Sequence, residues 1–302
     1  MSTPAYTPAA APRAAVPWLA DYIALTKPDV SLLVVLSALA GFYLASPARL
    51  DFALLAHTLL GTALVSAGTA AFNHFLERGD DARMRRTARR PLPAGRLEPG
   101  TAFVFAAALS LTGIGWLWLR VNLLASLLAF LTWASYLFLY TPLKKRTVWC
   151  TAVGAFPGAA PPLIGWAAAA GTLSFDAWVL FAIVFCWQFP HFLSIAWLYR
   201  DDYARAGVQM LPAVNPAGRA TGQQVVFFTL ALLPLGLLPV ARGLTGAASL
   251  WGVLLLSLAF GWLAVRLARA PTTLNARRLL QASIVYLPLL LLLLMADKRP
   301  PG

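Results

Sequence analysis

The chain has 302 residues, of which 60% are hydrophobic and 12% are charged. The charged share is about half that of a soluble globular domain, so water is not the main solvent of this protein. The formal net charge of +13 would fit nucleic-acid binding, but the basic residues lie in short loops between apolar runs. We therefore expect a protein of the lipid bilayer that binds no nucleic acid.

The N-terminal stretch is rich in Ala and Pro and has few charges. It predicts a disordered cytoplasmic segment over residues 1–26, without the pattern of a signal peptide. Residues 27–297 predict a single transmembrane domain. The two cysteines, Cys150 and Cys186, lie beside or inside apolar runs without metal-ligand spacing, so we expect them to be packing residues.

Apolar runs that are long enough to cross a hydrocarbon core of about 30 Å recur along this domain. One run contains Gly154, Pro157 and Pro161, which a membrane tolerates only where the freed backbone groups face protein or a cavity, so we expect it to line a cavity. The pattern predicts an all-α polytopic membrane bundle of about nine transmembrane helices. The expected spans are 30–46, 52–76, 101–119, 122–140, 148–170, 177–198, 224–242, 247–268 and 278–296.

The basic residues divide unequally between the two sides that nine alternating spans would define. Of the 24 basic residues, 19 fall on the side of the N-terminus and 5 on the other side. Because Lys and Arg are enriched in cytoplasmic loops, this division predicts a cytoplasmic N-terminus. We expect the membrane to be the bacterial inner membrane.

Two clusters contain five of the eleven acidic residues. In the first, Asn73, Glu77 and Asp81 are spaced at i, i+4 and i+8, which places three oxygen ligands on one helical face. Mg²⁺ prefers oxygen ligands and usually binds through one or two carboxylates together with substrate phosphates. The face predicts a Mg²⁺ site that also takes a diphosphate, with Asp80 as a further ligand. The spacing leaves open that these carboxylates only neutralise neighbouring arginines at a solvated helix end.

An arginine-rich loop, RMRRTARRPLPAGR, follows this cluster directly. Arginine forks bind phosphate oxygens bidentately and remain charged, so we expect Arg83, Arg86 and Arg90 to bind the diphosphate. Lys144 and Lys145, after the fourth run, are further candidates, although a plain cytoplasmic loop explains them equally well. Contact with lipid headgroups alone would explain the charge of the arginine loop but not the carboxylates beside it.

The second acidic cluster ends the sixth run, in the segment HFLSIAWLYRDDYARAG. Asp201 and Asp202 predict a second Mg²⁺ site, and Arg200 beside them is another candidate ligand for diphosphate. Both clusters fall on the predicted cytoplasmic side. The candidate catalytic residues are therefore Asn73, Glu77, Asp81, Asp201 and Asp202.

The chain has three histidines, His57, His74 and His191. A lone histidine in an apolar helix is more often a hydrogen-bonded packing residue than a ligand, and His57 and His74 fit that description. His191 follows Pro190 and lies about three helical turns before the second acidic cluster. We expect it to point into the same cavity from deeper in the membrane.

Three long motifs together resemble the protohaem IX farnesyltransferases, the haem O synthases of the UbiA-type intramembrane prenyltransferases. They are AFNHFLERGDDARMRRTARRPLPAGR, YTPLKKRTVWCTAVGAFPGAAPPLIGW and WQFPHFLSIAWLYRDDYARAGVQMLP. The resemblance covers the chain from Lys27 to the last span. Family members commonly have an acidic residue where Gly79 stands, whereas here Asp80 carries that charge. Which neighbouring carboxylate binds metal is therefore open.

The resemblance implies a nine-helix fold, dependence on Mg²⁺, and transfer of a farnesyl group from farnesyl diphosphate to a vinyl group of haem B, giving haem O. It also implies a downstream haem-modifying enzyme or oxidase assembly machinery as a partner. Asn73, Glu77 and Asp81 match the acidic motif of the family. Arg86 and Arg90 match its arginines, and His191 matches a histidine expected to orient the porphyrin or bind its iron.

Metal and arginines would stabilise the departing diphosphate, so that the allylic C–O bond ionises towards a farnesyl cation. Aromatic side chains could stabilise this cation and line the channel for the isoprenoid tail. The candidates are Phe72, Tyr140, Trp197 and Tyr199.

Three other functions fit parts of the pattern. Another aromatic acceptor, such as a quinone precursor, would need the same metal and diphosphate site. A transporter would also have broken helices and intramembrane polar residues, but here the polar residues lie at helix ends rather than at the midplane. A haem-binding assembly factor without catalytic activity is the third alternative.

Overall fold

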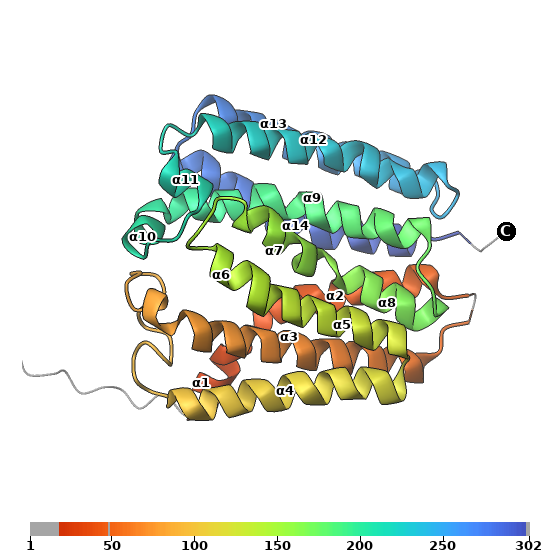
Figure 1. Cartoon of the computed structure of the whole chain (residues 1–302). Coiled ribbons are helices and arrows are strands. Elements are labelled where there is room, and N and C mark those ends of the chain that lie inside the picture. The colour runs from red at the N-terminus through yellow and green to blue at the C-terminus, as the bar shows by residue number, and fades with distance from the viewer. Residues whose placement is uncertain (1–17, 48, 300–302) are drawn as a thin grey trace, which may run out of the picture.

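The computed structural model describes residues 18–47 and 49–299, and within them every regular element is a helix (Figure 1). The all-α class is thus confirmed for the described residues. The elements are α1 (Trp18–Leu25), α2 (Pro28–Ala45), α3 (Phe52–Asp81), α4 (Pro99–Arg120), α5 (Leu123–Ala134), the π-helix η1 (Ser135–Tyr140), α6 (Thr141–Leu143), α7 (Cys150–Ala159), α8 (Pro161–Ala170), α9 (Phe175–Leu198), α10 (Arg200–Arg205), α11 (Leu211–Val214), α12 (Arg219–Ala241), α13 (Ala247–Arg269) and α14 (Thr273–Ala296).

Eight helical stretches in the described part of the chain are long and apolar enough to cross a membrane. They are α2, α3, α4, the continuous stretch Leu123–Leu143, α9, α12, α13 and α14. Large apolar side chains such as Trp118, Leu119 and Leu255 are exposed on the outer surface of the bundle. Exposure of so many large apolar groups fits lipid rather than water as the surrounding solvent.

The predicted span 148–170 is divided into α7 and α8, which meet at Ala160 and Pro161. Each contains 10 residues, so neither alone can cross the hydrocarbon core at a rise of about 1.5 Å per residue. The expected interruption of this run is therefore present, and the count of nine spans stays a prediction.

The segment 1–26, expected to be disordered, contains a helix in its described part. Trp18–Leu25 forms the helix α1, and residues 1–17 lie outside the described part. The buried carboxylate of Asp21 accepts hydrogen bonds from Arg96 at 2.8 and 3.0 Å, which fastens α1 to the arginine-rich loop. This long-range ion pair gives the short helix a fixed position that its composition does not predict.

Glycines let the backbones of neighbouring helices approach closely. A Cβ atom on Gly41 of α2 would collide with the Pro162 carbonyl of α8, and one on Gly165 would collide with the Ala38 carbonyl. In the α3–α4 pair, a Cβ on Gly113 would lie 2.7 Å from the Val65 amide nitrogen. Such contacts between small residues are a usual source of helix association in lipid.

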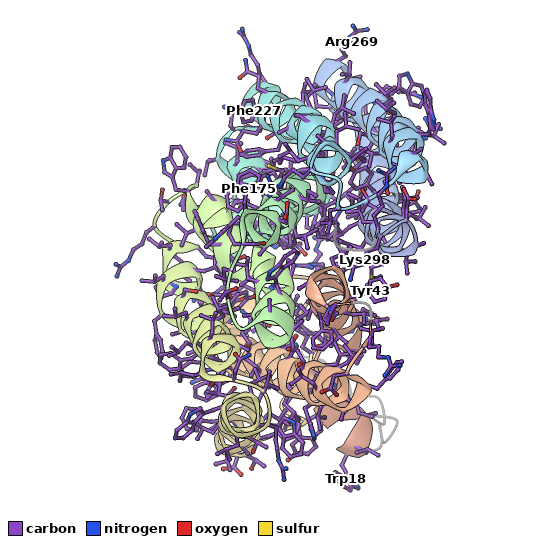
Figure 2. All side chains as sticks on the ribbon, turned by 90° about the vertical axis from the view of Figure 1, so that its right-hand side faces the viewer. Trp18, Tyr43, Phe175, Phe227, Arg269 and Lys298 are labelled. Atoms are coloured by element: carbon purple, nitrogen blue, oxygen red, sulfur yellow. The ribbon has the colours of Figure 1, made fainter. Side chains whose placement is uncertain are left out.

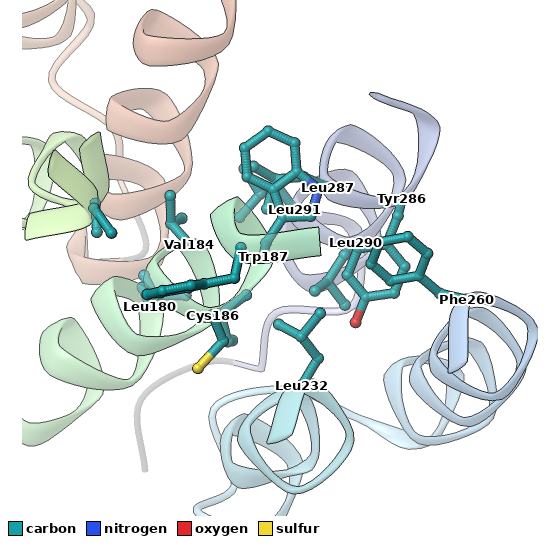
Figure 3. Packing of buried hydrophobic residues seen from close by; sticks show 14 of the residues in the cluster. Leu180, Val184, Cys186, Trp187, Leu232, Phe260, Tyr286, Leu287, Leu290 and Leu291 are labelled. Atoms are coloured by element: carbon teal, nitrogen blue, oxygen red, sulfur yellow. The ribbon is translucent and has the colours of Figure 1, made fainter. Parts of the chain in front are cut away.

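The largest core cluster surrounds α9, which lies between α12 and α14 (Figure 3). Tyr286 of α14 stacks on Phe260 of α13 with ring centroids 4.8 Å apart. Cys150 and Cys186 are both buried and free, as expected of packing residues.

The two ends of the bundle contain different segments of the chain. The loop after α3 and the short helices α6, α10 and α11 lie at one end, and the C-terminal end of α14 lies at the other (Figure 1). Figure 2 views the C-terminal end, where Lys298 lies beside Tyr43. The Lys298 ammonium donates to the carbonyl oxygens of Tyr43 at 2.7 Å and Ser46 at 2.6 Å, so it closes the end of α2.

Candidate functional site

The last turns of α3 carry the first acidic cluster. Arg90 Nη1 lies 2.8 Å from Asp81 Oδ2, and Lys144 Nζ lies 2.5 Å from Glu77 Oε1. Lys145 holds Asp80 at 2.7 Å. Each carboxylate of the cluster is thus paired with a cation, which comes from the loop after α3 for Asp81 and from the segment after α6 for Glu77 and Asp80. The geometry brings these predicted metal ligands together with three predicted diphosphate ligands.

Lys27 is a site residue that the sequence pattern alone does not indicate. Its ammonium donates to Asn73 Oδ1 at 2.6 Å. Its backbone has φ of 46°, a strained conformation for a residue with a side chain. Burial, followed by the nearby charge of Arg90, lowers the pKa of Lys27 to about 7. The position directly before Pro28 and the first apolar run was the available signal, but only the fold brings Lys27 to α3.

Lys144 also contacts an aromatic ring. Its ammonium lies 4.5 Å from the ring centroid of Tyr140, which in turn packs against Tyr136 at 5.0 Å. Burial alone would lower the pKa of Lys144, but the charge of Glu77 outweighs burial and holds this pKa well above its ordinary value. Lys144 therefore remains a cation inside the site.

The second acidic cluster meets the arginine-rich loop. Asp202 of α10 accepts a hydrogen bond from the backbone amide of Arg86 at 3.0 Å and also contacts Arg205. The Arg86 side chain donates to the Tyr203 hydroxyl at 3.1 Å and lies 4.8 Å from the Tyr199 ring centroid. The loop thus joins the end of α3 to α10, and the two acidic clusters share one end of the bundle (Figure 1).

Three predicted site residues lie at the margin of this constellation. Asp201 and Arg83 are exposed and form no ion pair within residues 18–47 and 49–299. Arg200 turns back on its own chain and donates to the Trp197 carbonyl at 3.0 Å. These residues are at the same end of the molecule, but they contact no acidic side chain of the site.

The candidate aromatic residues also separate by location. Tyr140 and Tyr199 contact cations of the site, Lys144 and Arg86. Phe72 packs instead against Phe103 at 5.4 Å, towards α4.

Whether these residues suit a divalent cation depends on their free donor atoms. Asp81 Oδ1 is buried and has no hydrogen-bond partner in the described structure, and the same holds for Asn73 Nδ2 and both ring nitrogens of His74. Buried polar atoms without partners are costly, and among these only the carboxylate oxygen of Asp81 is a ligand that Mg²⁺ prefers. Among the described residues, however, no group of three or more His, Cys, Asp or Glu side chains is arranged to hold a metal. The oxygen donors fit Mg²⁺ chemically if a diphosphate supplies further ligands and draws the lysines and Arg90 away from the carboxylates.

His191 lies on another face, between α9 and α14. Its Nδ1 atom lies 2.8 Å from Ser283 Oγ, and its ring stacks on Trp187 at 4.8 Å. None of its hydrogen bonds within the described residues reaches the acidic clusters. The expected cavity shared by His191 and the second acidic cluster therefore stays a prediction.

The bundle of membrane-crossing helices gathers carboxylates and cations at one end, where they form an intramembrane site for a charged substrate. The chain belongs to the UbiA prenyltransferase family, whose model matches residues 34–292. It is an integral membrane protein and an enzyme of the prenyltransferase class.

The comparisons with individual proteins agree with the family. A relative from Solibacter usitatus (strain Ellin6076), named protoheme IX farnesyltransferase, is 50% identical over 291 residues that cover 93% of this chain and 99% of the relative. The resemblance seen in the three motifs is thereby confirmed.

Two solved structures share the fold at low sequence identity. A digeranylgeranylglyceryl phosphate synthase structure has a TM-score of 0.76 at 19% identity and covers 93% of this chain and 99% of that chain. A UbiA homolog from Archaeoglobus fulgidus bound to GPP and Mg²⁺ has a TM-score of 0.66 at 14% identity and covers 91% of this chain and 99% of that chain. The polytopic membrane bundle expected from the sequence is therefore confirmed as the fold class.

Proposed function

We propose that the protein transfers the farnesyl group of farnesyl diphosphate to a vinyl group of haem B, giving haem O. Similarity over nearly the whole length to a relative named protoheme IX farnesyltransferase supports haem B as the acceptor. The observation that carries the chemistry is the joining of the α3 carboxylates to Asp202 through the arginine-rich loop. The charge division of the loops supports an active site on the cytoplasmic side of the bacterial inner membrane.

Asn73, Glu77 and Asp81 are the proposed Mg²⁺ ligands on α3, with Asp80 beside them. Asp201 and Asp202 are the proposed ligands of a second ion. The A. fulgidus homolog bound to GPP and Mg²⁺ supports a divalent cation in this family. When bound, Mg²⁺ supplies positive charge that stabilises the diphosphate leaving group.

The cations of the chain have a matching role. Arg86, Arg90, Lys27 and Lys144 bind and orient the diphosphate. Guanidinium and ammonium groups stabilise the negative charge that develops when the allylic C–O bond breaks and its electron pair leaves with the diphosphate. Lys144 and Arg90 exchange their carboxylate partners for phosphate oxygens on substrate binding.

The prenyl group then reaches the acceptor. A vinyl carbon of haem B bonds to the farnesyl carbon that has lost the diphosphate, and the cation formed beside the porphyrin takes up water and loses a proton. Tyr140 and Tyr199, which already contact cations of the site, present ring faces that stabilise the farnesyl cation. His191 binds the haem iron and fixes the position of the porphyrin.

Mass analysis of the haems tests this proposal. Membranes containing the chain would be incubated with farnesyl diphosphate, Mg²⁺ and either haem B or a quinone precursor. We expect haem B to gain a farnesyl group and a hydroxyl group, and this gain to disappear when EDTA is added. Unmodified haem B together with an alkylated quinone ring would assign the other acceptor. Modification of neither acceptor would refute haem B as the acceptor and leave the prenyltransferase with a different one.

A further inference from the structure

A hydrogen-bonded chain links His191 of α9 to the backbone of α14. His191 Nδ1 and Ser283 Oγ are 2.8 Å apart. The Ser283 hydroxyl also lies 2.6 Å from the Leu280 carbonyl oxygen of its own helix, in donor geometry. One hydroxyl therefore takes part in two short contacts.

The protons of this chain can be assigned by counting donors. A serine hydroxyl has one proton, and a carbonyl oxygen can only accept. If Ser283 gave its proton to His191, two bare oxygens would face each other at the 2.6 Å contact with Leu280. The proton of Ser283 therefore goes to Leu280, and the bond to His191 requires a proton on Nδ1. In a neutral imidazole this leaves a lone pair on Nε2.

Trp187 fixes the plane of the same imidazole. It lies one turn before His191 on α9, and the two rings stack with centroids 4.8 Å apart and an interplanar angle of 23°. The Trp187 indole nitrogen donates to the Ser283 carbonyl oxygen at 2.8 Å. Figure 3 shows Trp187 reaching from α9 towards the leucines of α14. Ser283 thus holds both rings, His191 through its side chain and Trp187 through its backbone.

The free face of His191 is Nε2. This atom makes no hydrogen bond within the part of the chain that the structure describes, and His191 is only half-buried. Unlike both ring nitrogens of His74, Nε2 of His191 is not fully buried. Nε2 is therefore accessible from outside the protein core.

We infer that Ser283 is a positioning residue that holds His191 as the Nδ1–H tautomer, with Nε2 directed at the iron of the haem acceptor. The inference rests on the proposed function for the identity of the ligand, but the tautomer itself does not. An imidazole that binds a metal through one nitrogen while the other donates to an oxygen has a fixed orientation and increased basicity. This arrangement would hold the iron at a fixed position relative to α9.

Nitrogen NMR of the ligand-free protein tests the tautomer. The chain has only three histidines, so ¹⁵N-histidine labelling gives few signals and His191→Ala assigns the relevant pair. We expect a protonated Nδ1 and an unprotonated Nε2 in the wild type, and a mixture of both tautomers in Ser283→Ala. A wild-type signal with the proton on Nε2 would overturn the inference, whatever the substrate of the enzyme.

Titration with haem B tests ligation. We expect His191→Ala to lose the absorption and EPR signature of a histidine-bound iron. Ser283→Ala should bind haem about 10- to 100-fold more weakly, with an altered signature, as is usual when the partner of a metal-binding histidine is removed. Ser283→Thr retains the hydroxyl and should restore both affinity and signature. If Ser283 served only as a small packing residue, Ser283→Ala would retain affinity and signature at least as well as Ser283→Thr.

The outcomes separate the two proposals. If the wild type binds haem B and forms haem O but Ser283→Ala keeps the wild-type signature and affinity, the role of Ser283 is refuted and the proposed function stands. If the wild type shows the expected tautomer but neither binds nor modifies haem B, the tautomer assignment stands, and both ligation and the proposed function fail.

Discussion

Asp80 and Asp81 are adjacent in sequence but differ in their surroundings. The Asp81 side chain is 1% exposed and keeps one buried oxygen without a partner, whereas the Asp80 side chain is 17% exposed and paired with Lys145. The sequence left open which of these carboxylates binds metal. Their burial now favours Asp81 over Asp80.

The first prediction compares these two carboxylates. Asp81→Asn should lower farnesyl transfer by at least about 100-fold and raise the Mg²⁺ concentration needed for half-maximal activity, because it removes a charged oxygen at the centre of the site. Asp80→Asn, the matched control, should stay within about tenfold of the wild type. Activity measured across a Mg²⁺ series checks both variants. Equal losses in the two variants would contradict the assignment.

The second prediction concerns two neighbouring arginines. Arg86→Ala should lower kcat/KM for farnesyl diphosphate by about 10- to 100-fold, since charge-assisted hydrogen bonds to phosphate are lost. Arg85 is exposed and has no side-chain partner among the described residues, so Arg85→Ala should change kcat/KM by less than about threefold. Initial rates at varied farnesyl diphosphate test the pair. A similar decrease in both variants would mean that only the summed charge of the loop matters.

At the scale of elements, the close approach of α2 to α8 depends on residues without a Cβ atom. Gly165 faces the Ala38 carbonyl directly, whereas Gly115 of α4 has no atom within 4 Å of the place its Cβ would occupy. Replacing glycine by alanine at these two positions therefore distinguishes the effect of helix packing on stability from the effect of helix propensity.

The third prediction uses this contrast. Gly165→Ala should destabilise the bundle by about 1–3 kcal/mol, because an inserted methyl group forces the two helices apart. Gly115→Ala should be neutral or more stable by about 0.5–1 kcal/mol, since alanine loses less entropy than glycine in a helix. Thermal unfolding in detergent, followed by tryptophan fluorescence, measures the difference. A stable Gly165→Ala variant would show that α2 and α8 can separate without loss.

The start of α13 supplies the fourth prediction. The Ser249 amide donates to Asp297 Oδ2 at 2.6 Å, and this bond lowers the pKa of Asp297 below its ordinary value of 3.8. A carboxylate with a lowered pKa in the folded state stabilises the protein above its unfolded pKa, and this contribution is lost as the pH falls through the folded pKa. Between about pH 5 and pH 3, the wild type should therefore lose more thermal stability than Asp297→Asn. Equal losses of melting temperature in the wild type and Asp297→Asn across this range would contradict the prediction.

At the scale of the whole molecule, α3 is long enough to reach from one end of the bundle to the other. It runs from Phe52 to Asp81, so Arg49 and Arg85 lie near opposite ends of a helix about 45 Å long. Both arginines are exposed, and the native cysteines Cys150 and Cys186 are buried.

The fifth prediction tests the orientation of the chain. A membrane-impermeant maleimide should label Arg49→Cys in intact cells from which the outer membrane has been removed. It should label Arg85→Cys only after the inner membrane is opened. The wild type, whose own cysteines are buried, should remain unlabelled in both conditions and serves as the control. Labelling of Arg85→Cys in unopened cells would reverse the proposed cytoplasmic location of the site.

Much of the fold could be predicted because membrane-crossing helices are defined locally. Apolar runs satisfy their own backbone hydrogen bonds in lipid, so length and composition indicated α3, α9 and α14 directly. The spacing of Asn73, Glu77 and Asp81 likewise fixed one helical face, and the Gly and Pro residues between 154 and 162 predicted an interrupted run. Helix α1 was missed because its position depends on a distant ion pair between Asp21 and Arg96.

The site beyond that one face was decided by tertiary structure. The sequence by itself determined the helical membrane bundle, the acidic face of α3 and the basic loop that follows it. It did not determine that Lys27 reaches Asn73, that Lys144 reaches Glu77, that the Arg86 amide holds Asp202, or that Ser283 of α14 contacts His191. The physical reason is separation along the chain: between 46 and 116 residues divide these partners, and only the packing of helices brings them together.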